Sequence, residues 1–414
     1  MFFSMDSSAL LKKTRKNFNN TNSYCNFVPI ILIRQFEIDM KSFHAGDYVS
    51  QGWYNSYHPN PINRNWVIDD MGIINLLSKA DRVVGRLDMF SEYVPNIDLF
   101  ISMHVYKEAT KSSNIEGTQT KIEDALLDEE DVPLDKRDDW AEVQNYTYAM
   151  NQAIQHLQTL PLSSRLIRDT HRVLMNGVRG ERKFPGEFRR SQNWIGGSSP
   201  SDAIFVPPVF GEVPNLISDI EDFIHNPICD LPDLIKIALI HYQFETIHPF
   251  SDGNGRVGRL LITLYLVSKG ILKRPILYLS DYLESHRRSY YDKIMGVRFN
   301  DDVESWVKFF LAGIVVTAEK GTAALNEIMA LQKEYEEEIK EMGSRSANAL
   351  KLIDSMYQNP FTDITKASLI IGQSFPTAKS LIDGLVKKGI LSEITGGKRG
   401  KKYVLSKYIG IFMK

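Results

Sequence analysis

The most apolar stretch of the chain covers residues 260–267 and reads Leu-Leu-Ile-Thr-Leu-Tyr-Leu-Val. Apolar side chains fill almost every position, which is typical of a helix buried on all sides and not of a surface helix with one apolar face. Gly270 follows, and glycine readily adopts the left-handed conformation that ends helices. The pattern therefore predicts a central core helix that stops near residue 270.

Further helices are predicted where apolar residues recur every three or four positions. They cover residues 70–80, 96–116, 139–160, 163–177, 213–226, 232–247, 278–295, 303–318 and 326–345. The last of these is rich in Glu and Lys, which predicts a charged helical connector. The expected fold class is mainly α.

A short segment of different character interrupts the helices. Two strand-like runs, residues 186–197 and 203–208, flank a turn rich in Gly, Ser and Pro. A lone hairpin is only marginally stable, so it either packs on the helices or serves as a mobile flap. Ile195, Gly196 and Gly197 lie at the end of the first run, whose edge can pair with an extended peptide.

Residues 346–414 form a self-contained pattern of three helices followed by a β-hairpin. The helices are expected over 347–357, 365–371 and 376–388, and the hairpin strands over 391–394 and 403–405. This order resembles a winged helix-turn-helix. Residues 387–402 contain a single acid, Glu393, and six basic residues, which suits a surface that faces phosphate. The basic residues are Lys387, Lys388, Lys398, Arg399, Lys401 and Lys402. Small winged helices also mediate protein contacts, so DNA binding and protein binding both stay open.

Composition narrows the class of protein. A net charge of −2 excludes a globally basic nucleic-acid binder, though not a local basic patch. Cys25 and Cys229 cannot form a disulfide framework and suit a reducing compartment, so a cytoplasmic location is expected. Residues 1–39 are a polar lead that we expect to be disordered or loosely packed. Its apolar run, residues 27–33, is too short to span a membrane and lacks a signal-peptide cleavage site.

Candidate chemistry is concentrated just before the core helix. Residues 248–259 read His-Pro-Phe-Ser-Asp-Gly-Asn-Gly-Arg-Val-Gly-Arg. Glycines let a backbone bend closely around a ligand, and N–H groups that open a helix attract phosphate. Residues 253–258 also fit the dinucleotide pattern G-x-G-x-x-G, but that pattern needs a preceding strand, and residues 232–247 are helical in period.

These residue types suit nucleotidyl or phosphoryl transfer. Arg256 and Arg259 lie three apart on the first turns of the helix and can grip different phosphates. Asp252 can hold Mg²⁺ between phosphates, and His248 can take the proton of an attacking hydroxyl because it titrates near neutrality. The glycine N–H groups can stabilise charge that develops on the transferred phosphorus group.

The same twelve residues match the pattern H-x-F-x-[D/E]-G-N-G-R-x-x-R without exception, and the chain thereby resembles the Fic family. Most members of that family transfer AMP from ATP to protein hydroxyls. The resemblance implies a helical Fic fold with a β-hairpin flap, in which residues 40–135 form an N-terminal helical region and residues 136–325 the catalytic core. It also implies ATP as substrate, Mg²⁺ as cofactor, and a target protein that presents a Ser, Thr or Tyr hydroxyl.

The resemblance implies a role for each residue of the motif. His248 would be the general base, Asp252 the Mg²⁺ ligand and Phe250 the anchor of the loop. Residues implied to bind ATP are Gly253, Asn254, Gly255, Arg256, Gly258, Arg259, Tyr290 and Tyr291. Arg256 would contact the α- and β-phosphates and Arg259 the γ-phosphate, whereas the two tyrosines fit packing equally well.

An acid in an unfavourable place adds an inhibitory element. Glu116 ends a predicted helix, where the helix dipole disfavours a negative charge and invites a cationic partner. Ser112, Glu116 and Gly117 fit the family's inhibitory motif [S/T]-x-x-x-E-[G/N], which implies that Glu116 pairs with Arg259. Occupied in this way, Arg259 could not orient the γ-phosphate of ATP.

Three functions stay open from the sequence. The first is self-inhibited AMP transfer, the second a Fic-like enzyme that moves another group or removes AMP, and the third a DNA-binding regulator with a Fic-like sensor domain. The sequence indicates no membrane partner, and it leaves open whether the protein forms a homodimer.

Overall fold

The computed structural model describes residues 37–94, 97–178, 183–395 and 400–413. The predicted lead therefore lies outside the described residues except for its end, Glu37–Asp39, which forms strand β1. This strand pairs in parallel with β4 (Asn65–Val67), so these three residues of the predicted lead are part of the fold. Strands β2 (Gly46–Ser50) and β3 (Asn55–Pro59) form an antiparallel hairpin.

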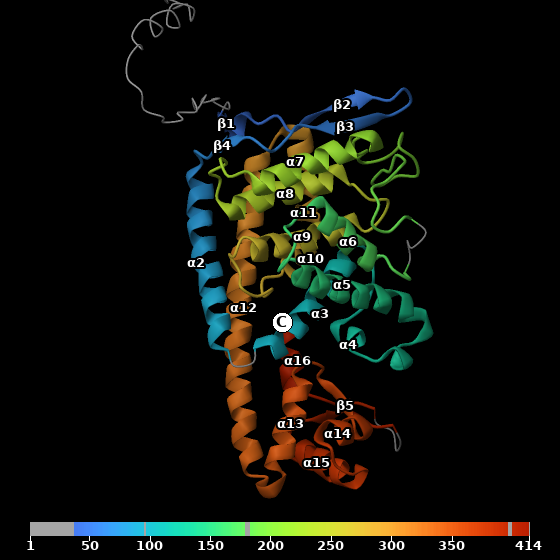
Figure 1. Cartoon of the computed structure of the whole chain (residues 1–414), viewed down its shortest axis with the longest axis vertical. Coiled ribbons are helices and arrows are strands. Elements are labelled where there is room, and N and C mark those ends of the chain that lie inside the picture. Colours follow the sequence, from blue (N-terminus) through green and yellow to red (C-terminus); the bar gives the residue numbers. More distant parts are fainter. Residues whose placement is uncertain (1–36, 95–96, 179–182, 396–399, 414) are drawn as a thin grey trace, which may run out of the picture. The chain divides into compact units, whose positions relative to one another are not determined.

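Helices make up most of the described chain, which confirms the predicted mainly α fold class (Figure 1). They are α2 (Met71–Tyr93), α3 (Ile97–Ile115), α4 (Ile122–Ala125), α5 (Arg137–His156), α6 (Ser164–Leu174), α7 (Val213–His225), α8 (Asp233–Ile247), α9 (Asn254–Ser268), α10 (Ser280–Ser285), α11 (Arg287–Asn300) and α12 (Val303–Lys340). Helix α2 packs along α12. Across the described residues, no helix combines the length and the apolar content that crossing a bilayer requires.

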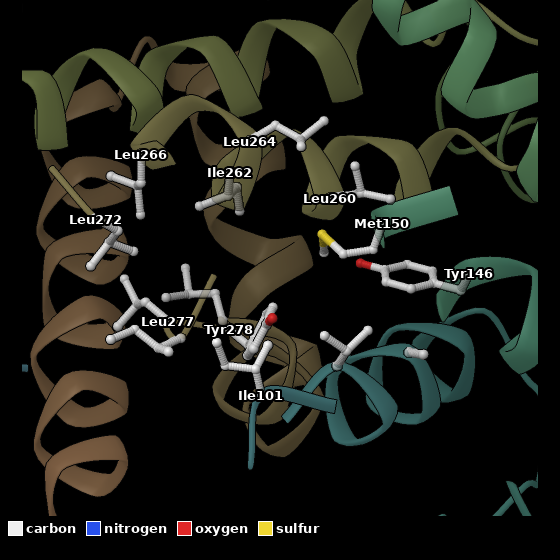
Figure 2. Close-up of a cluster of buried hydrophobic side chains, with 14 of the residues drawn as sticks. Ile101, Tyr146, Met150, Leu260, Ile262, Leu264, Leu266, Leu272, Leu277 and Tyr278 are labelled. Atoms are coloured by element: carbon white, nitrogen blue, oxygen red, sulfur yellow. The ribbon is translucent and has the colours of Figure 1, made fainter. Parts of the chain in front are cut away.

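Helices α8 and α9 form the buried centre of the fold. Residues 234–247 of α8 and 254–266 of α9 are all buried, as the all-round apolar pattern of α9 predicted. Figure 2 shows Leu260 of α9 beside Met150 of α5, with Ile262, Leu264 and Leu266 further along α9. Each fully buried aliphatic side chain contributes about 1.5–3 kcal/mol to the stability of the fold. The two helices that flank the loop before α9 are therefore held firmly in the core.

The two predicted flap strands do not form in the described structure. A single bridge joins Ile195 to Phe205, where the sequence predicts a hairpin. Gly196 and Gly197 have positive φ angles of 68° and 72°, so the chain turns away directly after the bridge. On the other side of the turn, Val206 accepts a hydrogen bond from an N–H of β3 at 2.8 Å. The second run is therefore partnered by β3 as well as by the first run.

The connector predicted over residues 326–345 is not a separate helix. Helix α12 runs without a break from the core into that region. Gly321 interrupts the apolar pattern between the two predicted helices, and it lies where α2 approaches closely, since a Cβ there would be 3.2 Å from Leu87. The buried stripe then resumes at Leu325 and Ile328, so packing against a neighbouring helix explains the change in pattern.

The C-terminal part has the predicted order of elements and two more. It comprises α13 (Ser346–Met356), β5 (Phe361–Asp363), α14 (Ile364–Ile371), α15 (Phe375–Lys387), β6 (Ser392–Glu393), β7 (Lys402–Val404) and α16 (Ser406–Phe412). The strands form one sheet in the order β5-β7-β6. Strand β5 and helix α16 were not predicted, and α16 packs against α3 and α12.

Several of the basic residues predicted to face phosphate have acidic partners. Lys388 pairs with Glu341 and Lys401 with Glu393, both at 2.7 Å, and Lys402 pairs with Asp131. Lys398 and Arg399 lie outside the described residues. The positive charge of this surface is therefore partly neutralised within the chain, and DNA binding through it stays a prediction.

Candidate active site

The loop between α8 and α9 is closed by one of its own side chains. Asn254 accepts a hydrogen bond from the Phe250 N–H at 2.7 Å and donates one to the Phe250 carbonyl at 2.8 Å. At the two ends of the loop, His248 and Gly253 adopt left-handed φ angles of 51° and 74°. This conformation is unusual for a histidine. The side chain of Asn254, predicted to face phosphate, is therefore engaged with the loop backbone.

His171 of α6 packs against the loop and binds its backbone. Its ring stacks on the buried ring of Phe250, with centroids 3.8 Å apart. The Nδ1 atom accepts a hydrogen bond from the Gly186 N–H at 2.8 Å, so the proton is on Nε2, which donates to the Asp252 carbonyl at 3.0 Å. Burial lowers the pKa of His171 to about 4, which keeps this neutral tautomer at neutral pH. In the sequence it is one more residue of an amphipathic helix.

Arg189 and Asn193 position His248 from the predicted flap segment. The Arg189 Nε donates to the His248 carbonyl at 3.0 Å, and its Nη2 donates to the carbonyls of Pro208 and Ile247. The Asn193 amide donates to the same His248 carbonyl at 3.3 Å. Burial lowers the pKa of Arg189 to about 10, and the guanidinium stays charged at neutral pH. The segment predicted as a flap thus carries a buried clamp on the loop.

Replacing Arg189 by lysine is expected to lower the free energy of unfolding by about 2 kcal/mol. One ammonium group cannot reach the separated carbonyls that the planar guanidinium serves, and buried acceptors left without partners are costly. Urea unfolding at neutral pH measures the change. The matched control is Arg190→Lys, because Arg190 is exposed and pairs with Glu187 at the surface. That variant should change stability by less than about 0.5 kcal/mol, and equal losses in both would contradict the clamp.

Arg256 is fixed by an acid that the motif does not contain. Its Nη1 lies 2.9 Å from the Glu142 Oε2 of α5, and the two side chains are only 5% and 6% exposed. Its Nη2 lies 3.6 Å from the Met175 sulfur. Removing one member of a buried ion pair costs about 3–5 kcal/mol, so Glu142 holds the guanidinium in place. Glu142 lies more than a hundred residues before the motif, and its spacing in α5 does not single it out.

Asp252 is the carboxylate of the loop. Its Oδ1 accepts a hydrogen bond from the Gly253 N–H at 2.7 Å, and its Oδ2 lies 3.0 Å from the Lys183 Nζ. Burial works to raise the pKa of Asp252, but Lys183 and Arg256 lower it, so the group is ionised. One partly exposed carboxylate beside a helix start that attracts phosphate is a donor set that Mg²⁺ accepts, because this ion otherwise keeps water and phosphate ligands.

Glu116 forms an ion pair with Arg259. The Arg259 Nη2 donates to the Glu116 Oε1 at 2.6 Å, while Nε and Nη2 also donate to the Ser112 hydroxyl and carbonyl at 2.8 and 2.9 Å. Gly117, with a φ of 110°, turns the chain just after this contact. Burial opposes ionisation of both partners, yet their attraction lowers the pKa of Glu116 and raises that of Arg259. Both groups are therefore charged, and the arginine side chain is only 1% exposed.

The Glu116 carboxylate also lies on the start of α9. A Cβ at Gly255 would be 2.1 Å from the Glu116 Oε1, so the carboxylate rests directly against that backbone. The first hydrogen bond of α9 runs from the Val257 N–H to the Gly253 carbonyl, so the N–H groups before Val257 have no carbonyl partner within the helix. Such N–H groups at a helix start attract anions. The negative charge of Glu116 is unfavourable at the C-terminal end of α3, which it follows in the chain, but it is favourable at the N-terminal end of α9, where the carboxylate lies.

The remaining predicted nucleotide-binding residues face inward, apart from one. The Tyr290 hydroxyl lies 2.9 Å from the Nε2 of His241, whose Nδ1 lies 3.0 Å from the Gly258 carbonyl. A Cβ at Gly258 would lie 2.3 Å from the Glu245 Oε1, so close packing of α8 on α9 accounts for this glycine. The ring of Tyr291 lies 5.1 Å from that of Tyr290 in a tilted arrangement but is exposed, so only this tyrosine of the pair presents a surface to a ligand.

The fold and the site together define a mainly helical protein with an anion-attracting loop at the start of a buried helix. Residues 74–155 match the N-terminal region of the Fic/DOC family, and residues 161–266 match the Fic/DOC family domain itself. The chain therefore contains the N-terminal region and the domain of the Fic/DOC family.

Individual relatives agree with this assignment. A protein adenylyltransferase Fic from Aedes aegypti is 36% identical over 125 residues, which cover 30% of this chain and 22% of that protein. A probable protein adenylyltransferase from Aquifex aeolicus is 38% identical over 106 residues, or 25% of this chain and 31% of that protein. The chain thus spans less than a third of the length of either relative. A crystal structure of a Fic family protein from Desulfovibrio desulfuricans G20 covers 81% of this chain and 96% of its own, with a TM-score of 0.51 at 20% identity, and so shares the fold.

Proposed function

We propose that this protein transfers AMP from ATP to a hydroxyl side chain of a target protein and of itself, and that Glu116 inhibits the transfer. One observation carries the proposal: an acidic side chain occupies the anion position at the start of α9 and holds Arg259. A carboxylate at that place is a mimic of the phosphate that the helix start would otherwise attract. The names of the adenylyltransferase relatives support the chemistry.

The triphosphate would lie along the start of α9. The backbone N–H of Gly255 would face the phosphates, whereas the Gly253 N–H is held by the Asp252 carboxylate. Arg256 would contact the α- and β-phosphates, and Arg259 the γ-phosphate once Glu116 leaves. The ion pair with Glu142 would hold Arg256 ready, so this arginine would not need to reorganise when ATP binds. Asp252 would hold Mg²⁺, which supplies positive charge against the phosphate oxygens when bound.

The transfer step would use His248 as general base. The target hydroxyl oxygen attacks the α-phosphorus and forms the new O–P bond, while the bond from that phosphorus to the α,β-bridging oxygen breaks and pyrophosphate leaves. The hydroxyl proton passes to His248. The Nδ1 of this histidine is buried within the protein, which leaves Nε2 as the nitrogen that takes the proton. The clamp by Arg189 and Asn193 would keep the ring in place.

The segment around Ile195, Gly196 and Gly197 would place the target. Only one backbone bridge closes this segment, so an extended target chain can add hydrogen bonds along its edge. Such pairing fixes where the hydroxyl lies without reading a particular sequence.

Labelled ATP tests the proposal. The Glu116→Gly variant is incubated with a cell lysate and ATP that carries radiolabel at either the α- or the γ-phosphate. Protein-bound label from the α-position alone, with an AMP adduct seen by mass spectrometry, is the expected result. Label from the γ-position would identify a kinase and overturn the proposal, as would the absence of label from both positions.

A further inference from the structure

A buried arginine outside the motif is bound to the helix end that carries His248. Arg298 lies in the last turn of α11 and is only 6% exposed. Its Nη2 donates to the Glu245 carbonyl at 3.0 Å, and its Nε donates to the Thr246 hydroxyl at 3.1 Å. Both acceptors belong to the last turn of α8, which His248 follows directly. Arg298 therefore holds the backbone from which the proposed base projects.

The same guanidinium also contacts the flap segment, residues 186–208. Its central carbon lies 3.7 Å from the centre of the Phe205 ring, which is buried. The Phe205 carbonyl accepts a hydrogen bond from the Ile195 N–H at 2.8 Å, and the Phe205 N–H donates to the Ile195 carbonyl at 3.2 Å. A cation over the face of an aromatic ring is attracted to it, most strongly where water is excluded. Arg298 therefore supports the residue that closes the bridge to Ile195.

No carboxylate of the described residues lies within ion-pair distance of the Arg298 guanidinium. Its contacts are the carbonyl and the hydroxyl of α8, the Phe205 ring, and the Met295 sulfur at 3.2 Å. Burial lowers the pKa of Arg298, yet an arginine keeps its proton in proteins. A buried charge is costly, so an apolar side chain would serve better if the position needed packing alone. The groups that the charge joins are the negative end of the α8 dipole and an electron-rich ring face.

Helix α11 is a fixed point for both contacts. It packs against α12, and its Tyr290 and Ile294 are buried. Arg189 also binds the end of α8, but it belongs to the flap segment itself. Arg298 is thus a third body that holds the flap segment and the end of α8 at once, through two faces of chemistry that a lysine does not combine.

We propose that Arg298 is a positioning residue for the transfer: its guanidinium fixes the bridge between Ile195 and Phe205 relative to His248. A target chain paired at the edge of this bridge then presents its hydroxyl within reach of the base. The position of the hydroxyl matters because rates fall steeply when reacting atoms are misplaced. The part that concerns transfer rests on the proposed function, whereas the fixing of the two segments does not.

Hydrogen exchange of full-length chains tests the fixing without an activity assay. Arg298→Lys keeps the charge but loses the planar guanidinium, and Phe205→Leu keeps an apolar side chain but loses the ring face. In both variants the amide protons of Ile195 and Phe205 should exchange at least about tenfold faster than in the wild type, while those of α9 stay as protected as before. Arg288→Lys is the matched control, because Arg288 is an exposed residue of α11 that pairs with Asp292, and it should change neither. Unchanged protection of the two amides in Arg298→Lys overturns the proposal, as does an equal loss of protection in α9.

Kinetics tests the positioning. In the Glu116→Gly background, label is transferred from α-labelled ATP to a full-length His248→Ala chain, which serves as acceptor at varied concentration. Arg298→Lys and Phe205→Leu should each lower kcat/KM for the acceptor at least about fivefold and leave KM for ATP within about twofold, because the proposed phosphate contacts lie on α9.

The kinetic outcomes separate the inference from the proposed function. An unchanged kcat/KM for the acceptor, or an equal effect on KM for ATP, overturns the positioning role of Arg298. Absence of transfer in every chain, Glu116→Gly itself included, contradicts the proposed function and with it the part that concerns transfer. Hydrogen exchange then still decides whether Arg298 fixes the two segments.

Discussion

Replacing Glu116 by glycine is expected to raise AMP transfer by about 5- to 150-fold, the range of typical coupling between two sites. The substitution removes the carboxylate from the start of α9 and frees one N–H of the Arg259 Nη2, which still donates to the Ser112 carbonyl. Under the proposed function, the γ-phosphate of ATP would then take the place of Glu116 and bring the α-phosphorus into line with the attacking hydroxyl. The initial rate of label transfer from α-labelled ATP to the chain itself measures the change.

Two further substitutions separate the charge of Glu116 from its size. Glu116→Gln keeps the length of the side chain and an oxygen for Arg259 but removes the negative charge, so its rate should lie between those of the wild type and the glycine variant. Glu129→Gly is the matched control, since Glu129 is an exposed acid of the same N-terminal region outside the site. Equal rates for the wild type and Glu116→Gly would contradict inhibition by this residue.

The sequence was most informative where many residues agree. The core helix α9 could be predicted because its apolar residues cover every face, and only a buried helix suits that pattern. The pairing of Glu116 with Arg259 was anticipated only through the family resemblance, because the two residues are 143 positions apart and no local spacing relates them. The unfavourable position of an acid at a helix end was the one physical signal in the sequence itself.

The residues that support the site left no such signal. His171 and Arg189 act largely on backbone carbonyls, and a carbonyl has no residue type that a pattern could reveal. Glu142 acts on a side chain from a different helix, and in the sequence it is one acid among several at the start of α5. Helix α16 follows strand β7 almost directly, so its short apolar pattern could not be told from a continuation of the strand. Such features depend on tertiary contacts.

Removing the proposed base, His248, should abolish the AMP transfer that the removal of Glu116 releases. In the Glu116→Gly background, His248→Ala is expected to lower the transfer rate by about 10²- to 10⁴-fold, the usual contribution of general base catalysis. Label transfer and the AMP adduct are measured as before, and far-UV circular dichroism checks the fold. His156→Ala is the control, because His156 lies at the end of α5, outside the loop. A rate that survives His248→Ala would assign the base to another group.

The pH dependence of the unlocked enzyme gives a second test of His248. Burial and the charge of Arg298 lower the pKa of His248 to about 4, whereas Glu116 works to raise it. Removing Glu116 therefore moves this pKa further down. A base must be neutral to accept a proton, and His248 is neutral above its pKa, so the rate of Glu116→Gly should be level between about pH 6 and 8 and fall only in more acidic solution. A rate that rises about threefold between pH 6 and pH 7 would instead report a histidine with its ordinary pKa, one that faces water and is not buried beside the loop.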